Sequence, residues 1–258
     1  MLAAAAASRI TSRIATLSLV LKTRLPVFLE ANMQRILFFL TCLVSLAPAY
    51  SASLDKVTSA EAAGGLKQAL TDASAAAVAK LGVENGYLGN PKVKIPLPPS
   101  LQRVESAMRV MGMRQQADEL VVAMNRAAEA AAPEAKTLLV DAAKKMTVQD
   151  AKQILAGGDT AATEYFRRTT RQQLTERFLP IVKKATDSVG LAQQYNSIAG
   201  QGAALGLVKE DQATVERYVT AKALDGLYLM IGEQEKAFRQ NPLGASSDIV
   251  KKVFGALR

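Results

Sequence analysis

Residues 124–170 read MNRAAEAAAPEAKTLLVDAAKKMTVQDAKQILAGGDTAATEYFRRTT and carry the clearest helix signals of the chain. Apolar residues recur at the 3.6-residue period of a helix from Leu120 to Ala132. Pro133 suits the first turn of a second helix, where its missing N–H costs nothing. Thr147 and Asp159 are typical N-caps of two more helices. Helices this short, joined by tight turns, predict closely packed antiparallel neighbours.

Similar signals continue on both sides of this stretch. Thr58, with Glu61 three residues later, forms a capping-box pattern for a helix that Gly82 ends. Further helices are predicted from Ser100 to Gly112 and from Asp211 to Arg239, with Ser100 and Asp211 as their N-caps, and over 172–189, 191–205 and 248–257. The sequence therefore predicts one all-α domain over residues 58–257, a compact multi-helix bundle of about eight helices.

A Pro/Gly-rich extended loop interrupts the helices. Residues 82–100 read GVENGYLGNPKVKIPLPPS, a composition that excludes a helix. Within the loop, Val93, Ile95 and Leu97 alternate with polar or prolyl residues, which predicts an extended run with one side inward. The loop is either a binding loop or a connector packed over the helices, and the connector is favoured because long ordered loops are only sometimes functional.

The N-terminal part carries the features of a secretory signal peptide. Arg35 supplies the positive end, residues 36–47 form an apolar core too short to span a bilayer, and an A-x-A motif ends at Ala49. We therefore predict a signal peptide over residues 33–49, cleaved after Ala49 or Ser51, and an exported, periplasmic protein.

Residues 1–32 precede this pattern and are rich in Ala, Ser and Thr, with several basic residues. They are either a transit-like segment or a spurious N-terminal extension from a start codon assigned too early. The clean start of a signal peptide at Met33 favours the extension.

The composition limits the available chemistry. The single cysteine, Cys42, lies inside the predicted signal peptide, and the chain has no His and no Trp. Nucleophiles of the Ser-His-Asp and Cys-His kinds are therefore excluded from the mature chain, as are the usual zinc sites. Residues 1–49 hold five of the 32 basic and one of the 23 acidic residues, so the remaining chain carries only +5. We expect no metal, no cofactor and no nucleic-acid partner.

Carboxylates, or Lys and Tyr as acid/base groups, are what remains for catalysis, and a pair of carboxylates could hydrolyse a glycosidic bond. Capping and solvation explain each candidate without a catalytic role, so an enzyme is disfavoured. The candidate acids are Glu129, Glu134, Asp141, Asp150, Asp159, Glu233 and Glu235.

Two pairs of polar residues are candidates for a ligand site. Asn125 and Glu129 lie four residues apart, side by side on the edge of a helix face. Residues 218–231 are apolar nearly all round, which is typical of a central, buried helix, and only Lys222 and Asp225 interrupt them. We expect a buried or half-buried Lys222–Asp225 pair, joined by Glu129 or Asn125. The pair either fixes helix register, the favoured role, or binds a ligand.

A basic segment, Arg167–Lys184, has six basic residues and one acid, Glu176. Arg167, Arg168 and Arg171 are candidates for binding an anionic lipid or glycan surface. The alternative is the solvated face of a helix, which is favoured because no aromatic stacking platform accompanies the segment.

The runs GYLGNPKVKIPLP, MNRAAEAAAPEA, GGDTAATEYFRRTT, FLPIV, YVTAKALDGLYLMI and KKVFG resemble one known family. From about Ala60 to Gly255 the chain is similar to the domain of unknown function 4197 family, which is bacterial, exported and helical, with no established activity. The resemblance implies export and an all-helical fold, and it supplies no site residues. The hypothesis is an exported binding or envelope-associated protein; the alternative is a carboxylate-dependent hydrolase acting on an envelope glycan.

Overall fold

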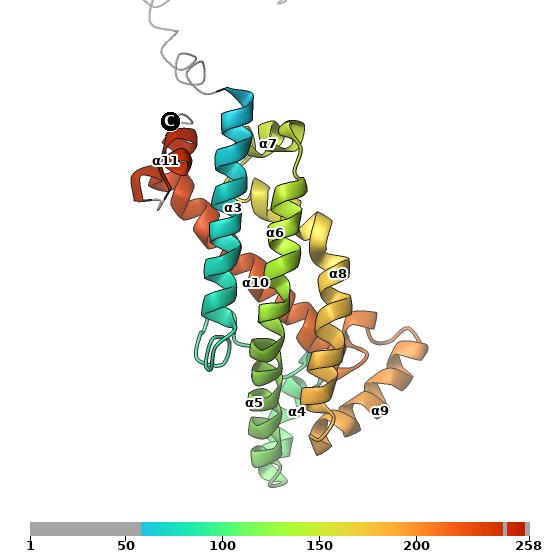
Figure 1. The fold of residues 1–258 in the computed structure, drawn as a ribbon. Helices are drawn as coiled ribbons and strands as arrows, with labels where there is room; N and C mark the ends of the chain where they lie inside the picture. Colours follow the sequence, from blue (N-terminus) through green and yellow to red (C-terminus); the bar gives the residue numbers. More distant parts are fainter. Residues whose placement is uncertain (1–57, 245–246, 256–258) are drawn as a thin grey trace, which may run out of the picture. The chain divides into compact units, whose positions relative to one another are not determined.

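Helices form the regular structure of the described part of the chain, residues 58–244 and 247–255 of a computed structural model (Figure 1). These residues belong to the compact unit Ser53–Arg258, and the predicted signal peptide and upstream extension lie outside them. The predicted all-α class is confirmed. The α-helices are α3 (Ser59–Leu81), α4 (Pro99–Val110), α5 (Arg114–Ala131), α6 (Ala135–Lys145), α7 (Val148–Leu155), α8 (Ala161–Thr186), α9 (Gly190–Ala204), α10 (Val215–Gln240) and α11 (Asp248–Gly255).

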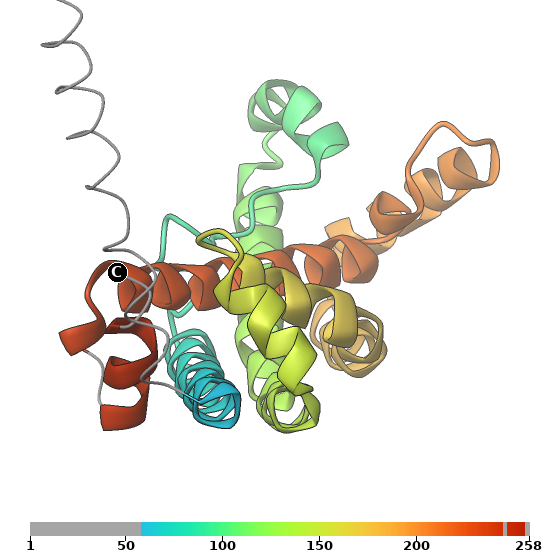
Figure 2. The ribbon, with the colours of Figure 1, turned by 90° about the horizontal axis from the view of Figure 1, so that it is seen from above.

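The helices α3, α6 and α8 lie side by side in one layer, and α10 crosses behind them (Figures 1 and 2). The helix α10 contacts α3, α5 and α8, so it holds the layer together. Its residues 218–231 are buried except for a few positions that include Lys222 and Leu229. The prediction of a central, buried helix is confirmed here.

Helices α5 and α6 follow each other along one column (Figure 1). The 3-10 turn η2 (Ala132–Glu134) joins them, and Ala131, Ala132 and Ala135 all have helical backbone angles. Pro133 removes one hydrogen-bond donor without turning the chain back, because its fixed φ suits the first turn of a helix. The predicted antiparallel arrangement is therefore wrong for this pair of helices.

Two of the predicted N-caps are confirmed and three are wrong. Thr58 and Thr147 each form a complete capping box. The caps expected at Asp159, Ser100 and Asp211 are not used. The residues at the N-cap positions of α8, α4 and α10 are Thr160, Pro98 and Thr214, and Asp211 lies in a 3-10 turn before α10. The N-terminus of α8 is capped by a side chain from another helix, as described below.

The loop between α3 and α4 keeps the predicted alternation without forming a strand. Val93, Ile95 and Leu97 are buried, and the side chains between them are exposed. The loop approaches α10 closely at Gly226, where a Cβ would lie 3.0 Å from the Tyr87 ring and 3.1 Å from Val93 Cβ. The missing side chain at Gly226 therefore lets the loop lie directly against α10.

Candidate functional site

Asn125 on α5 binds the backbone of the loop as a neighbouring strand would. Its Oδ1 accepts from the Ile95 N–H at 2.8 Å, and its Nδ2 donates to the Ile95 carbonyl at 2.8 Å. The same amide nitrogen donates to the Val121 carbonyl at 2.8 Å. The fully buried amide is thus occupied by structural partners and holds Ile95 against the helices.

Glu129, one turn further along α5, fixes the other end of the loop. Its Oε1 accepts from the N–H groups of Tyr87 and Leu88, each at 3.0 Å, and its Oε2 accepts from Arg126 at 2.7 Å. Burial opposes ionisation of Glu129, but these three donors outweigh burial and lower the pKa of the carboxyl group. Burial, together with the charge of Glu129, raises the pKa of Tyr87, whose hydroxyl donates to the Ala223 carbonyl at 2.7 Å.

Glu235 on α10 supplies the missing cap of α8. Its carboxylate accepts from the N–H groups of Ala162 at 3.0 Å and Thr163 at 2.9 Å, and from the Thr163 hydroxyl at 2.8 Å. Arg239 pairs with the same carboxylate at 3.0 Å. A carboxylate is favoured at this position because the first N–H groups of a helix have no partner within the helix.

The prediction of a buried Lys222–Asp225 pair is wrong. Lys222 is exposed, and its ammonium lies 6.0 Å from the centroid of the Tyr218 ring. The Asp225 Oδ1 atom accepts from Arg171 Nη1 at 2.9 Å and Arg167 Nη1 at 3.3 Å. The longer arginine side chains reach across from α8, so Asp225 pairs between helices and remains 46% exposed.

Neither Asn125 nor Glu129 joins this cluster, because the loop backbone holds both of them. The seven predicted site residues therefore separate into a structural pair on α5 and a surface group on α8 and α10. Of this surface group, Lys222, Asp225 and Arg167 line one groove.

The groove has a volume of about 520 Å³ and is walled by segments that are far apart in sequence. The loop contributes Lys92 and Lys94, α8 contributes Arg167, and α10 contributes Lys222 and Asp225. We call this feature the basic groove. Among the described residues that line it, Asp225 is the only carboxylate.

The cations of the basic groove differ in how well they are neutralised. Lys92 forms an ion pair with Glu233, and Arg167 pairs with Asp225. No carboxylate of the described residues forms an ion pair with Lys94 or Lys222, and both side chains are exposed. The groove thus holds two ammonium groups whose charge is available to an anion.

Two aromatic rings of α10 lie close to cations of the groove. The Arg167 guanidinium lies 4.9 Å from the centroid of the Tyr228 ring, within the range of a cation–π contact. The Tyr218 ring lies beneath Lys222, and burial raises the pKa of Tyr218 to about 12, so this tyrosine is neutral at physiological pH.

Arg168 and Arg171 lie outside the groove lining, in an adjoining hollow on α8 that also includes Arg167. Arg168 lies 5.8 Å from the centroid of the Tyr165 ring. Further along the helix, Arg177 pairs with Glu134 at 3.7 Å. The three candidate arginines therefore share one hollow, whereas Arg177 pairs with an acid outside it.

Sequence reasoning missed Lys92 and Lys94 as groove residues. Their signal was present, because the alternation that buries Val93 and Ile95 places the two lysines on the opposite, exposed side. The sequence does not show that α10 lies next to the loop and brings Lys222 to the same groove.

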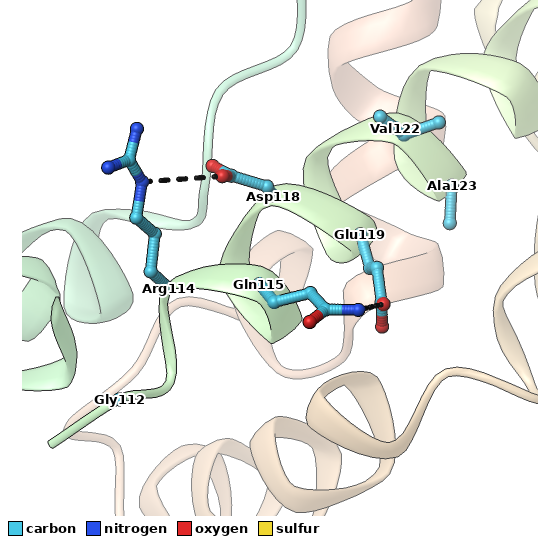
Figure 3. Close-up of a pocket in the computed structure, with 7 residues that line it drawn as sticks. All are labelled: Gly112, Arg114, Gln115, Asp118, Glu119, Val122 and Ala123. Carbon is cyan, nitrogen blue, oxygen red and sulfur yellow. Dashed lines mark hydrogen bonds and ion pairs between the residues drawn. The ribbon is translucent and has the colours of Figure 1, made fainter.

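Another hollow, of about 710 Å³, lies beside the start of α5 (Figure 3). All its lining residues come from the single segment 112–123. Its polar side chains pair with one another along the helix, Arg114 with Asp118 at 3.8 Å and Gln115 with Glu119 at 2.9 Å (Figure 3). No second element contributes a side chain, so this hollow is a weaker candidate site than the basic groove.

Most of the candidate catalytic acids have structural or surface partners. Besides Glu129 and Glu235, Asp150 completes a capping box, Glu233 pairs with Lys92, and Glu134 pairs with Arg177. No cluster of three or more potential metal-binding side chains occurs within residues 58–244 and 247–255. In the same residues, no helix is both long enough and apolar enough to cross a membrane.

Comparison with known proteins gives one match. The model of the family described as "Protein of unknown function (DUF4197)" matches residues 56–255, which confirms the resemblance seen in the sequence. No curated protein and no solved structure matches the chain.

Proposed function

Because the chain belongs to the DUF4197 family of proteins of unknown function, whose description assigns no activity, we propose a function from the basic groove itself. The protein is an exported binding protein, and the groove holds an anionic group of its ligand. The observation that carries this proposal is the pair of exposed lysines, Lys94 of the loop and Lys222 of α10, that line one groove.

Physical chemistry supports an anion at this position. Cations that line a concave surface focus their potential and raise the local concentration of anions. Lys94 and Lys222 have no carboxylate partner among the described residues, so an anion would not have to displace one from them. Hydrogen bonds to charged groups contribute about 1.5–3 kcal/mol each, enough for two lysines to hold a phosphate or carboxylate group.

The alternative, a carboxylate-dependent hydrolase, receives less support. Two of its best-buried candidates, Glu129 and Glu235, accept three hydrogen bonds or more each from structural partners. The basic groove contains a single carboxylate, Asp225, whereas glycoside hydrolysis generally uses two. The groove therefore favours binding.

Export is the second part of the proposal and depends on the signal-peptide pattern over residues 33–49. Its test is N-terminal sequencing of the protein after expression in a bacterial host. We expect a periplasmic protein that begins at Tyr50 or Ala52. A cytoplasmic protein that retains residues 33–49 would refute export without affecting the groove.

The test of the groove is titration with inorganic phosphate at low salt, followed by NMR chemical shifts. We expect the double variant Lys94→Gln/Lys222→Gln to bind phosphate at least about tenfold more weakly, because it loses two charge-assisted contacts. The matched control is Lys136→Gln/Lys236→Gln, which removes the same charge from exposed positions outside the groove. Equal affinities in the two double variants would refute the proposal.

A second arm distinguishes a soluble ligand from a lipid headgroup. Sedimentation with phosphatidylglycerol vesicles at low and high salt uses the same two double variants. Vesicle binding that falls with salt and with the groove variant identifies a headgroup as a ligand, since exposed charges are screened within about 8–10 Å at physiological ionic strength. Phosphate binding without vesicle binding identifies a soluble anion.

A further inference from the structure

The carboxylate of Asp225 is an unusual component of a groove proposed to bind anions. It is 46% exposed and lines the groove beside Arg167 and Lys222. Both arginine contacts, from Arg167 and Arg171, go to the same oxygen, Oδ1. Among the described residues, no hydrogen-bond donor contacts the second oxygen, Oδ2.

Asp225 is not needed simply to hold Arg167 in place. The Arg167 guanidinium also lies over the Tyr228 ring at 4.9 Å, and its Nε lies 3.6 Å from Glu164. A carboxylate that faces the groove repels a simple anion, yet its free oxygen can accept hydrogen bonds from a ligand. The described lining therefore offers one carboxylate acceptor among several cationic donors.

The rest of the lining fits a ligand that carries hydroxyl groups. The amide side chains of Gln102 and Gln212 line the groove and can hydrogen-bond hydroxyls, although Gln102 Nε2 already donates to the Leu97 carbonyl at 2.6 Å. Pro96 and Leu229, both exposed, provide apolar surface for the C–H face of a ring. The apolar surface would contribute little to binding a bare phosphate ion.

We infer that the ligand of the basic groove is a hydroxylated anion, such as a phosphorylated sugar, and that Asp225 selects it over simple anions by accepting a hydroxyl hydrogen bond. This inference rests on the proposed function of the groove. It adds a ligand class and a residue that determines specificity.

The experiment compares inorganic phosphate, glucose 6-phosphate and glucose as probes, by calorimetry or NMR titration of the mature protein. Wild type is expected to bind glucose 6-phosphate at least about tenfold more tightly than phosphate, a difference of about 1.4 kcal/mol. In Asp225→Asn, phosphate is expected to bind more tightly because a repelling charge is removed. The affinity for glucose 6-phosphate is expected to increase less, because the variant also loses the carboxylate that accepts the hydroxyl hydrogen bond. The preference of the variant for the sugar phosphate therefore shrinks several-fold.

The matched control is Glu164→Gln, which removes the other carboxylate near Arg167 but does not line the basic groove. Its preference between the two phosphates should equal that of wild type. Unchanged urea midpoints show that both variants are folded, as expected for side chains that are 46% and 59% exposed.

The outcomes separate the two proposals. If wild type binds phosphate but shows no preference for glucose 6-phosphate, or if Asp225→Asn keeps the full preference, the ligand class inferred here is wrong and the anion groove stands. Binding of glucose as tight as that of glucose 6-phosphate would also overturn the inference, because the anion would then contribute nothing. If wild type binds neither phosphate, the proposed groove and this inference both fail.

Discussion

Replacing Glu235 by Leu tests whether the cap of α8 depends on a side chain from α10. The carboxylate is 2% exposed and accepts from the N–H groups of Ala162 and Thr163, the Thr163 hydroxyl and Arg239. Leucine fills a similar volume and accepts no hydrogen bond. Two buried N–H groups at the start of α8 would then lack their acceptor.

The expected loss of stability follows from these contacts. An unsatisfied buried donor costs about 1–3 kcal/mol, and breaking a buried ion pair by removing one partner costs about 3–5 kcal/mol. The two costs do not simply add, since Arg239 still has the Ile154 carbonyl, at 2.9 Å, as an acceptor in the variant. We therefore expect Glu235→Leu to lower the free energy of unfolding by about 3–5 kcal/mol in total.

Urea denaturation followed by circular dichroism measures this loss, with an expected shift in midpoint of about 1–2 M for a typical m-value. The control, Glu233→Leu, makes the same substitution on the same helix. Glu233 is 35% exposed and, among the described residues, its one ion pair is with Lys92 at the surface, so its loss should cost less than about 1 kcal/mol. Equal urea midpoints for Glu235→Leu and Glu233→Leu would refute the assignment of Glu235 as the cap of α8.

Three further predictions concern single side chains. The Thr220 hydroxyl is buried and has no hydrogen-bond partner among the described residues, so Thr220→Val should raise the free energy of unfolding by about 1 kcal/mol. Thr170→Val, which loses a bond to the Tyr228 hydroxyl at 2.9 Å, should lower the free energy of unfolding by a similar amount, and the reverse order in urea melts would contradict this. The Lys252 ammonium and the Thr58 capping contacts lower the pKa of Glu61 from 4.5 to about 2, so the stability from this contact is present above pH 4.5 and lost as the pH falls towards 2. Glu61→Gln should therefore have a lower urea midpoint than wild type at pH 7 and an equal one near pH 2. A difference in midpoint that stays the same at both pH values would show that ionisation of Glu61 does not contribute to stability. Because Lys222 is exposed, Lys222→Met should change the free energy of unfolding by less than about 1 kcal/mol, and a larger loss in urea melts would show that Lys222 is buried.

Much of the fold could be predicted from local signals. The capping boxes at Thr58 and Thr147 act within four residues, so their chemistry is complete in the sequence. The apolar pattern of residues 218–231 similarly identifies α10 as central and buried. These predictions succeeded because they depend on neighbours along the chain.

The failures involve partners that are distant in sequence. Lys222 and Asp225 are close enough on one helix to pair, but the arginines of α8 compete for Asp225 and the sequence does not place them there. The sequence identifies Glu235 only as a candidate catalytic acid, because the helix end that it caps lies 73 residues away. Only the packing of α8 against α10 brings these groups together.

Asn125 and Glu129 hold the loop at two points, Ile95 and the Tyr87–Leu88 pair, from the same helix. Their bonds go to backbone atoms, so they specify the path of the loop without specifying the exposed side chains between them. Lys92 and Lys94 could therefore be exchanged for other residues while the path is retained. The loop is thus suited to diversification, since new ligand preferences could be engineered or could evolve on it without redesign of the supporting helices.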